Sequence, residues 1–123
     1  TGKTVTIFAH HGKSNAARIG SKVNVLLKMS QNLNADIALM GHVHCTAVVP
    51  TVRLDVRRGR LRQRHRLSVI TSTYLKTYDG QHDGYGSRAA YDPPVIGAPA
   101  ILINPEEGRY AGIDDLDALR WLV

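Results

Sequence analysis

The segment Asp36-Ile-Ala-Leu-Met-Gly-His-Val-His44 decides the fold class of this chain. Its first five residues form an apolar run with the length of a buried strand, and a glycine and two histidines follow at once. A similar run, Val5-Thr-Ile-Phe-Ala9, ends in His10-His11-Gly12. Between the two runs, apolar residues from Ile19 to Leu33 recur at helical spacing, which predicts an amphipathic helix of roughly three turns. A strand, a helix and a strand with short connections predict a parallel βαβ unit and an α/β fold.

The two histidine clusters follow the carboxyl ends of the predicted strands, where open α/β sheets bind their ligands. His42 and His44 are two residues apart, so in an extended segment both rings point to the same side. Gly41 before them permits a backbone conformation that a side chain would forbid. Imidazole is the commonest metal ligand in proteins. The pattern therefore predicts a metal site made of His42, His44 and a histidine of the His10-His11 pair, between which strand phase does not decide. The alternative is that these are ordinary polar residues of loops.

A change to a period of two after Thr46 predicts a β-hairpin with its turn at residues 57–60. Seven of the eleven arginines lie within its fourteen central residues, 53–66. Arginine binds phosphate oxygens through two donors at once, so we expect a phosphate-bearing substrate or a nucleic acid to contact one face of the second arm. The alternative is a solvated outer face that deters edge pairing, and the absence of interleaved aromatic residues speaks against base stacking. The candidate contact residues are Arg60, Arg62 and Arg64.

Composition indicates one small globular domain: the chain has 123 residues, 43% of them hydrophobic, and a net charge of +6. No apolar run approaches the ~20 residues of a membrane span, so we expect no membrane contact. Cys45 is the only cysteine, which excludes an internal disulfide and favours a cytoplasmic location. We expect this thiol to be buried, because the residue after His44 points away from the proposed metals. The chain begins at Thr1, directly before a strand, and we expect it to be part of something longer.

The two histidine motifs resemble the last two motifs of the calcineurin-like metallophosphoesterase superfamily. The likeness extends to the segments 69–78 and 85–94, as in phage and prokaryotic members, and so covers most of the chain. It implies an α/β fold that is the C-terminal half of a four-layer α/β/β/α sandwich, with a basic β-hairpin after the Gly-His-x-His motif. Residues 1–123 are then a single partial domain without its N-terminal half. We also expect a core strand at 98–103, a helical turn at 87–91 and a short helix at 114–123.

The resemblance assigns roles to the histidines. His10 and His42 bind one metal, His44 binds the other, and His11 is a catalytic residue that faces the substrate. In the complete enzyme, two divalent transition metal ions (Mn, Fe or Zn) activate a hydroxide that hydrolyses phosphomonoesters, phosphodiesters or nucleic acids. The family's Asp-x-His, Gly-Asp and Gly-Asn-His motifs do not occur in this sequence.

This departure from the family predicts a catalytically incomplete chain. Because the bridging carboxylate is missing, we expect the chain alone to hold at most one metal, weakly. A complementary N-terminal half would have to complete the site. A homo-oligomer is a further expected partner, because half of such a sandwich would expose a sheet edge and a sheet face. Two alternatives stay open: a non-catalytic basic module that binds nucleic acid or supports assembly, and a mononuclear zinc hydrolase that uses three histidines alone.

Overall fold

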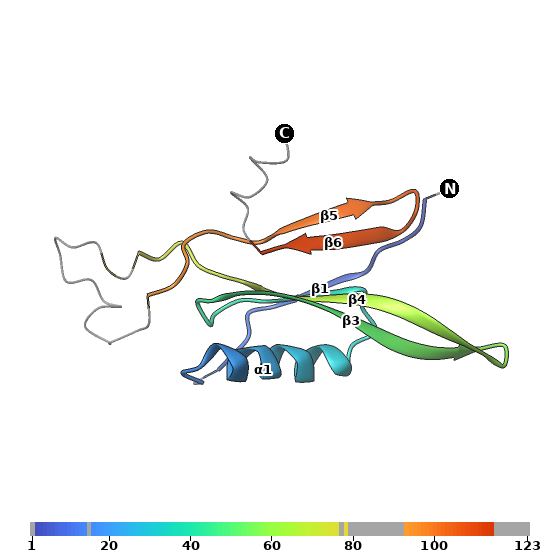
Figure 1. The fold of residues 1–123 in the computed structure, drawn as a ribbon, viewed down its shortest axis with the longest axis horizontal. Coiled ribbons are helices and arrows are strands. Elements are labelled where there is room, and N and C mark those ends of the chain that lie inside the picture. The colour runs from blue at the N-terminus through green and yellow to red at the C-terminus, as the bar shows by residue number, and fades with distance from the viewer. Residues whose placement is uncertain (1, 15, 77, 79–92, 115–123) are drawn as a thin grey trace.

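The computed structural model describes residues 2–14, 16–76, 78 and 93–114 (Figure 1). This part of the chain forms a small α/β structure with one helix, a mixed four-stranded sheet and a separate two-stranded hairpin. The elements are, in order, β1 (Ile7–His10), α1 (Ile19–Gln31), β2 (Ile37–Met40), β3 (Thr46–Arg57), β4 (Arg60–Thr71), β5 (Ala100–Asn104) and β6 (Arg109–Ile113).

The four-stranded sheet has the order β1-β2-β4-β3. β1 pairs with β2 in parallel and β2 pairs with β4 in parallel, whereas β3 and β4 form an antiparallel hairpin. The predicted parallel βαβ unit and the predicted hairpin are therefore both confirmed. His10 is level with Met40, and Met40 is level with Ile70, so β1, β2 and β4 reach the same edge of the sheet together.

Each face of the sheet is covered by a different layer (Figure 1). α1 packs on one face, where Leu26 contacts a cluster that includes Met40 and Ile70. The β5–β6 hairpin packs on the other face, over a cluster of Ile37, Leu67 and Val69. The second contact is close: a Cβ at Gly112 of β6 would stand 2.4 Å from Val48 Cγ1. The side-chain alternation of the strands thus produces two thin apolar layers.

The predicted core strand at 98–103 occurs as β5, which pairs with β6 in a separate two-stranded sheet. Ile101 packs against the core, whereas Leu102 is 51% exposed, so only part of this strand is buried. The predicted helical turn at 87–91 lies outside the described residues, and so does all of the predicted helix at 114–123 except its first residue. The described part of the chain contains no helix with the length and apolar character needed to cross a membrane.

Cys45 is buried, as predicted, at 7% exposure beside Ile70 and Val43. Burial raises the pKa of its thiol above the ordinary value, and the nearby charge of Lys22 lowers it in part. The unfolded chain therefore loses this proton first as the pH rises. We expect the free energy of unfolding to be unaffected by this group below about pH 8.5 and to fall above it. Urea denaturation of the native chain and of Cys45→Ala at pH 8 and pH 10 measures the difference; an equal decline in both proteins would contradict this origin.

Candidate functional site

The parallel pairing of β1 and β2 brings the two histidine motifs to one edge of the sheet. His11 directly follows β1, and His42 is the second residue after β2. His11 Nε2 lies 3.0 Å from His42 Nδ1, and their rings meet edge to face with centroids 4.8 Å apart. Both side chains are exposed. The motifs are thus side by side, as the sequence predicted, although the residue that contacts His42 is His11.

His10, the last residue of β1, has a different environment. Its Nδ1 accepts a hydrogen bond of 2.8 Å from the backbone N–H of Gly12, and its ring stacks on that of Phe8. Because Nδ1 is an acceptor here, the neutral ring carries its hydrogen on Nε2. The ring of His10 is therefore held in a fixed orientation, and it offers a donor to its surroundings rather than a free lone pair.

Gly12 is the residue that allows the two motifs to approach. Its φ is +80°, in the left-handed region that favours glycine. A Cβ at this position would stand 2.5 Å from Met40 Cγ and 3.0 Å from the carbonyl oxygen of Gly41. The sequence analysis gave Gly12 no role, although a glycine after a histidine pair at a strand end is a signal for such a turn.

The segment 42–44 is not extended. The rings of His42 and His44 were expected to point to the same side because of an extended backbone, and this reason is wrong. His42 has φ +68° and His44 has φ +48°. The N–H of Val43 donates to the carbonyl oxygen of Gly41 at 2.9 Å, which closes a tight three-residue turn around His42. Gly41 itself is not in the left-handed region; it is needed for space, because a Cβ there would lie 3.3 Å from the His11 carbonyl oxygen. Two strained residues in one short loop are typical of functional sites.

The imidazole groups are suitable ligands for a transition metal, but their arrangement in the described part of the chain does not form a metal site. Among the described residues, no three His, Cys, Asp or Glu side chains are grouped so that they could hold a metal ion. In the His11–His42 pair, one ring donates and the other accepts, so one unprotonated nitrogen remains for a ligand. A metal would have to replace this hydrogen bond, or the one from Gly12 to His10. The predicted set of His10, His42 and His44 stays a prediction.

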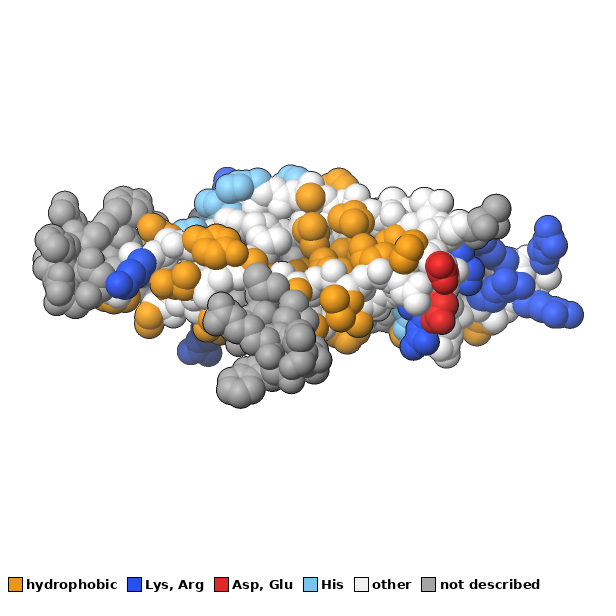
Figure 2. All heavy atoms as spheres, turned by 90° about the horizontal axis from the view of Figure 1, so that it is seen from above, with side chains coloured by type: hydrophobic (Ala, Val, Ile, Leu, Met, Phe, Trp, Pro, Cys, Tyr) orange, Lys and Arg blue, Asp and Glu red, His pale blue; other side chains and the backbone are white. Residues whose placement is uncertain are grey.

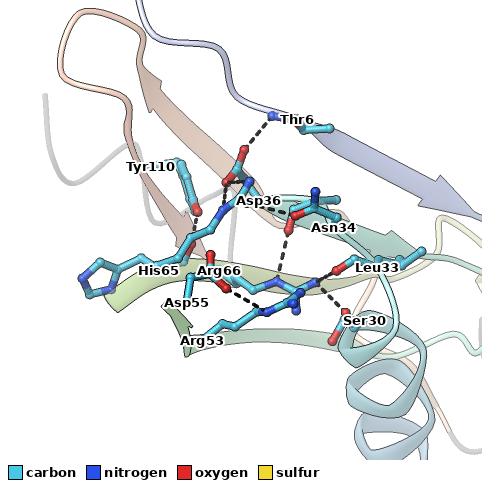
Figure 3. Close-up of polar contacts among 12 residues, drawn as sticks. Thr6, Ser30, Leu33, Asn34, Asp36, Arg53, Asp55, His65, Arg66 and Tyr110 are labelled. Carbon is cyan, nitrogen blue, oxygen red and sulfur yellow. Dashed lines mark hydrogen bonds and ion pairs between the residues drawn. The ribbon is translucent and has the colours of Figure 1, made fainter. Parts of the chain in front are cut away.

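The arginines of the hairpin divide into two groups. Arg64 binds Asp36 through Nε and Nη2, at 3.0 and 2.8 Å, and donates to Asn34 at 2.9 Å. Arg66 is buried and donates to backbone carbonyls in the last turn of α1 and just after it, including that of Leu33 at 2.8 Å (Figure 3). By contrast, Arg60 and Arg62 are exposed. Among the predicted contact residues, Arg64 is therefore engaged within the fold, and the other two are available.

Asp36 joins Thr6 and Arg64 in a polar cluster beside β4, a role that the sequence analysis did not assign to it. It is 8% exposed, and its second oxygen accepts from the Thr6 N–H at 2.9 Å (Figure 3). The hydrogen bond to Asp36 raises the pKa of Arg64 above its ordinary value, so the guanidinium keeps its charge. Burial, with the charge of Asp36, raises the pKa of Tyr110, whose hydroxyl donates to the His65 carbonyl oxygen. The cluster stabilises the contact between β4, β6 and the start of β2.

No protein-family model, curated protein or solved structure matches this chain. Two features of the chain bear on its function. One is the histidine edge, the carboxyl ends of β1 and β2 with His10, His11, His42 and His44. The other is the group of arginines in the β3–β4 hairpin.

Proposed function

We propose that this chain provides part of the active site of a metal-dependent phosphoesterase of the calcineurin-like type. His10, His42 and His44 are the imidazole ligands, and His11 faces the substrate. The observation that carries the proposal is the parallel placement of both histidine motifs at one sheet edge, with His11 and His42 in contact at 3.0 Å. Strained backbone at His42 and His44 supports it, because such strain persists where the position of a side chain matters.

In this proposal the chain is the C-terminal half of a four-layer α/β/β/α sandwich. α1, the main sheet and the β5–β6 hairpin are its part of the layers. A complementary N-terminal half supplies the carboxylates, since no carboxylate joins the histidines in a metal-binding group among the described residues. When bound, two divalent ions (Mn, Fe or Zn) polarise the phosphoryl group and acidify a water molecule. The chain itself positions the imidazoles: β1 carries His10 to the end of the sheet, and the turn closed by the Val43 N–H fixes the backbone at His42.

A metal titration tests the proposal. We expect the chain to bind about one equivalent of Mn²⁺ or Zn²⁺, weakly, in isothermal titration calorimetry. His42→Ala should lower the affinity at least tenfold, since removal of one ligand of an incomplete site leaves too few donors. His65→Ala is the matched control, because His65 is an exposed histidine on the hairpin, remote from the edge. Equal binding by the native chain and His42→Ala would overturn the assignment, and two tightly held ions would contradict the incomplete site.

A second candidate is a non-catalytic module that binds nucleic acid. It is favoured by the exposed arginines at the end of the hairpin, which need an anionic partner but no metal. It leaves the strained turn around His42 without a role, and for this reason we place it second.

A further inference from the structure

The end of the β3–β4 hairpin is a cationic surface, which we call the arginine tip: Arg57, Arg58, Arg60 and Arg62. All four are exposed, and no hydrogen bond or ion pair joins them to another described residue. The nearest acidic residue in the hairpin, Asp55, is already paired with Arg53 at 3.1 Å. Figure 2 shows the Lys and Arg side chains gathered at this end of the molecule.

Charge repulsion between Arg57 and Arg60 is not relieved by the fold, whereas Arg62 lies opposite Asp55 in the register. Arg57 and Arg60 are directly opposite each other in the antiparallel register. Like charges in this position destabilise a hairpin by up to about 1 kcal/mol. Because both lie on the same face of the two strands, together with Arg62, an anion that binds there meets three guanidinium groups at once.

The turn itself carries a further unfavourable arginine. Arg58 has φ +51° and Gly59 has φ +71°, so both central residues of the two-residue turn are in the left-handed region. Asn-Gly or Asp-Gly is the sequence that this turn type favours. An arginine at the first position adds a positive charge and costs about 1 kcal/mol of backbone energy. Both features indicate that charge, rather than stability, is what the tip provides.

The arginine tip and the histidine edge lie at opposite ends of β4. Ile70 is level with Met40, and therefore with His10, whereas Arg60 is ten residues earlier in the same strand. At 3.3 Å per residue, the two ends are roughly 33 Å apart. A small phosphate ester cannot contact both, but ten base pairs of duplex, at 3.4 Å each, cover this length. Figure 2 shows a group of histidines well away from the Lys and Arg side chains at this end of the molecule.

We propose that the arginine tip binds the sugar–phosphate backbone of a nucleic acid that is long enough to reach the histidine edge. This inference deepens the proposed function. It rests on that function in one respect, namely that the bound polymer is the phosphodiester substrate. Binding at the tip needs no metal, because guanidinium groups supply the charge. The neighbouring Arg64 and Arg66 take no part, since both are held within the fold.

The test is the affinity of the full chain for fluorescein-labelled 16-bp duplex DNA, measured by fluorescence anisotropy between 50 and 200 mM salt with EDTA present. We expect the triple variant Arg57→Gln, Arg60→Gln, Arg62→Gln to bind at least tenfold more weakly at 50 mM salt. The negative slope of log K against log salt should become shallower by about 2 to 3, since each lost phosphate contact removes about 0.9. The matched control removes three positive charges elsewhere on the exposed surface, by Lys28→Gln, Lys76→Gln and Arg109→Gln, and should leave the slope within one unit.

Two outcomes overturn the inference: an unchanged slope in the triple variant, or binding to vesicles with anionic lipids together with none to DNA. The proposed function is tested separately, with Mn²⁺ in place of EDTA. In Mn²⁺ the 16-bp duplex should gain affinity over a 6-bp duplex, which spans roughly 20 Å and cannot reach the histidine edge from the tip. His42→Ala should remove this gain and leave tip binding intact. If the 16-bp duplex gains no affinity over the 6-bp duplex in Mn²⁺, the phosphoesterase role is contradicted. Binding at the arginine tip is not affected by that result, because the arginine-dependent slope is measured without metal.

Discussion

Replacing Arg66 with methionine is expected to lower the free energy of unfolding by about 3 kcal/mol. Arg66 is 8% exposed and donates to the carbonyl oxygens of Ala35 at 3.1 Å, of Leu33 at 2.8 Å and of Ser30. Ser30 is in the last turn of α1, and its carbonyl also accepts from the Leu33 N–H at 3.2 Å, whereas Leu33 and Ala35 follow the helix and depend on the guanidinium. Methionine fills most of the same volume but leaves the carbonyls of Leu33 and Ala35 without this donor, and each buried unsatisfied acceptor costs about 1 to 3 kcal/mol.

The measurement is urea denaturation of the native chain, of Arg66→Met and of the control Arg62→Met. Arg62 is exposed on the same strand, so its replacement should change stability by less than about 0.5 kcal/mol. Amide exchange at the end of α1 should also accelerate in Arg66→Met, because the guanidinium joins this end of the helix to the sheet. A loss below 1 kcal/mol would show that the contacts of Arg66 with the helix end contribute little.

This arginine marks the limit of what the sequence could predict in the hairpin. The alternation of residues 60–66 correctly placed the arginines on one face, since the register pairs them with one face of β3. Their separate environments depend on Asp36 and on the end of α1, which are about thirty residues away in the chain. A local period carries no information about such neighbours. For the same reason the pairing of β5 with β6 was not predicted, because β6 contains a glycine and an arginine and lacks a strong strand pattern.

The histidine edge was predictable as a place but not in its geometry. Two apolar runs, each followed by histidines, were sufficient to place His11 and His42 at one sheet edge. The assumption of an extended backbone was wrong, because the left-handed residues 42 and 44 turn the chain just after β2. Histidine enters that region more readily than most residues, but the sequence His-Val-His does not by itself announce such a turn.

The largest effect at the histidine edge is expected from Gly12→Ala. The added methyl group would lie 2.5 Å from Met40 Cγ and 3.0 Å from the Gly41 carbonyl oxygen, at a φ of +80°. The left-handed backbone costs about 1 kcal/mol, and the displaced Met40 costs a further 1 to 3 kcal/mol, because it is almost fully buried. We therefore expect the free energy of unfolding to fall by about 2 to 4 kcal/mol. Urea denaturation measures this change.

Gly20→Ala is the matched control, because a Cβ at Gly20 in the first turn of α1 meets no atom within 4 Å. Alanine favours the helix, so this variant should gain about 0.5 kcal/mol. Gly12→Ala should also weaken metal binding, since the tight turn at Gly12 sets the close approach of the two motifs and the contact between His11 and His42. If Gly12→Ala lost stability but bound metal like the native chain, the close approach of the two motifs would be needed for folding alone. The ligands would then have to be sought away from this edge.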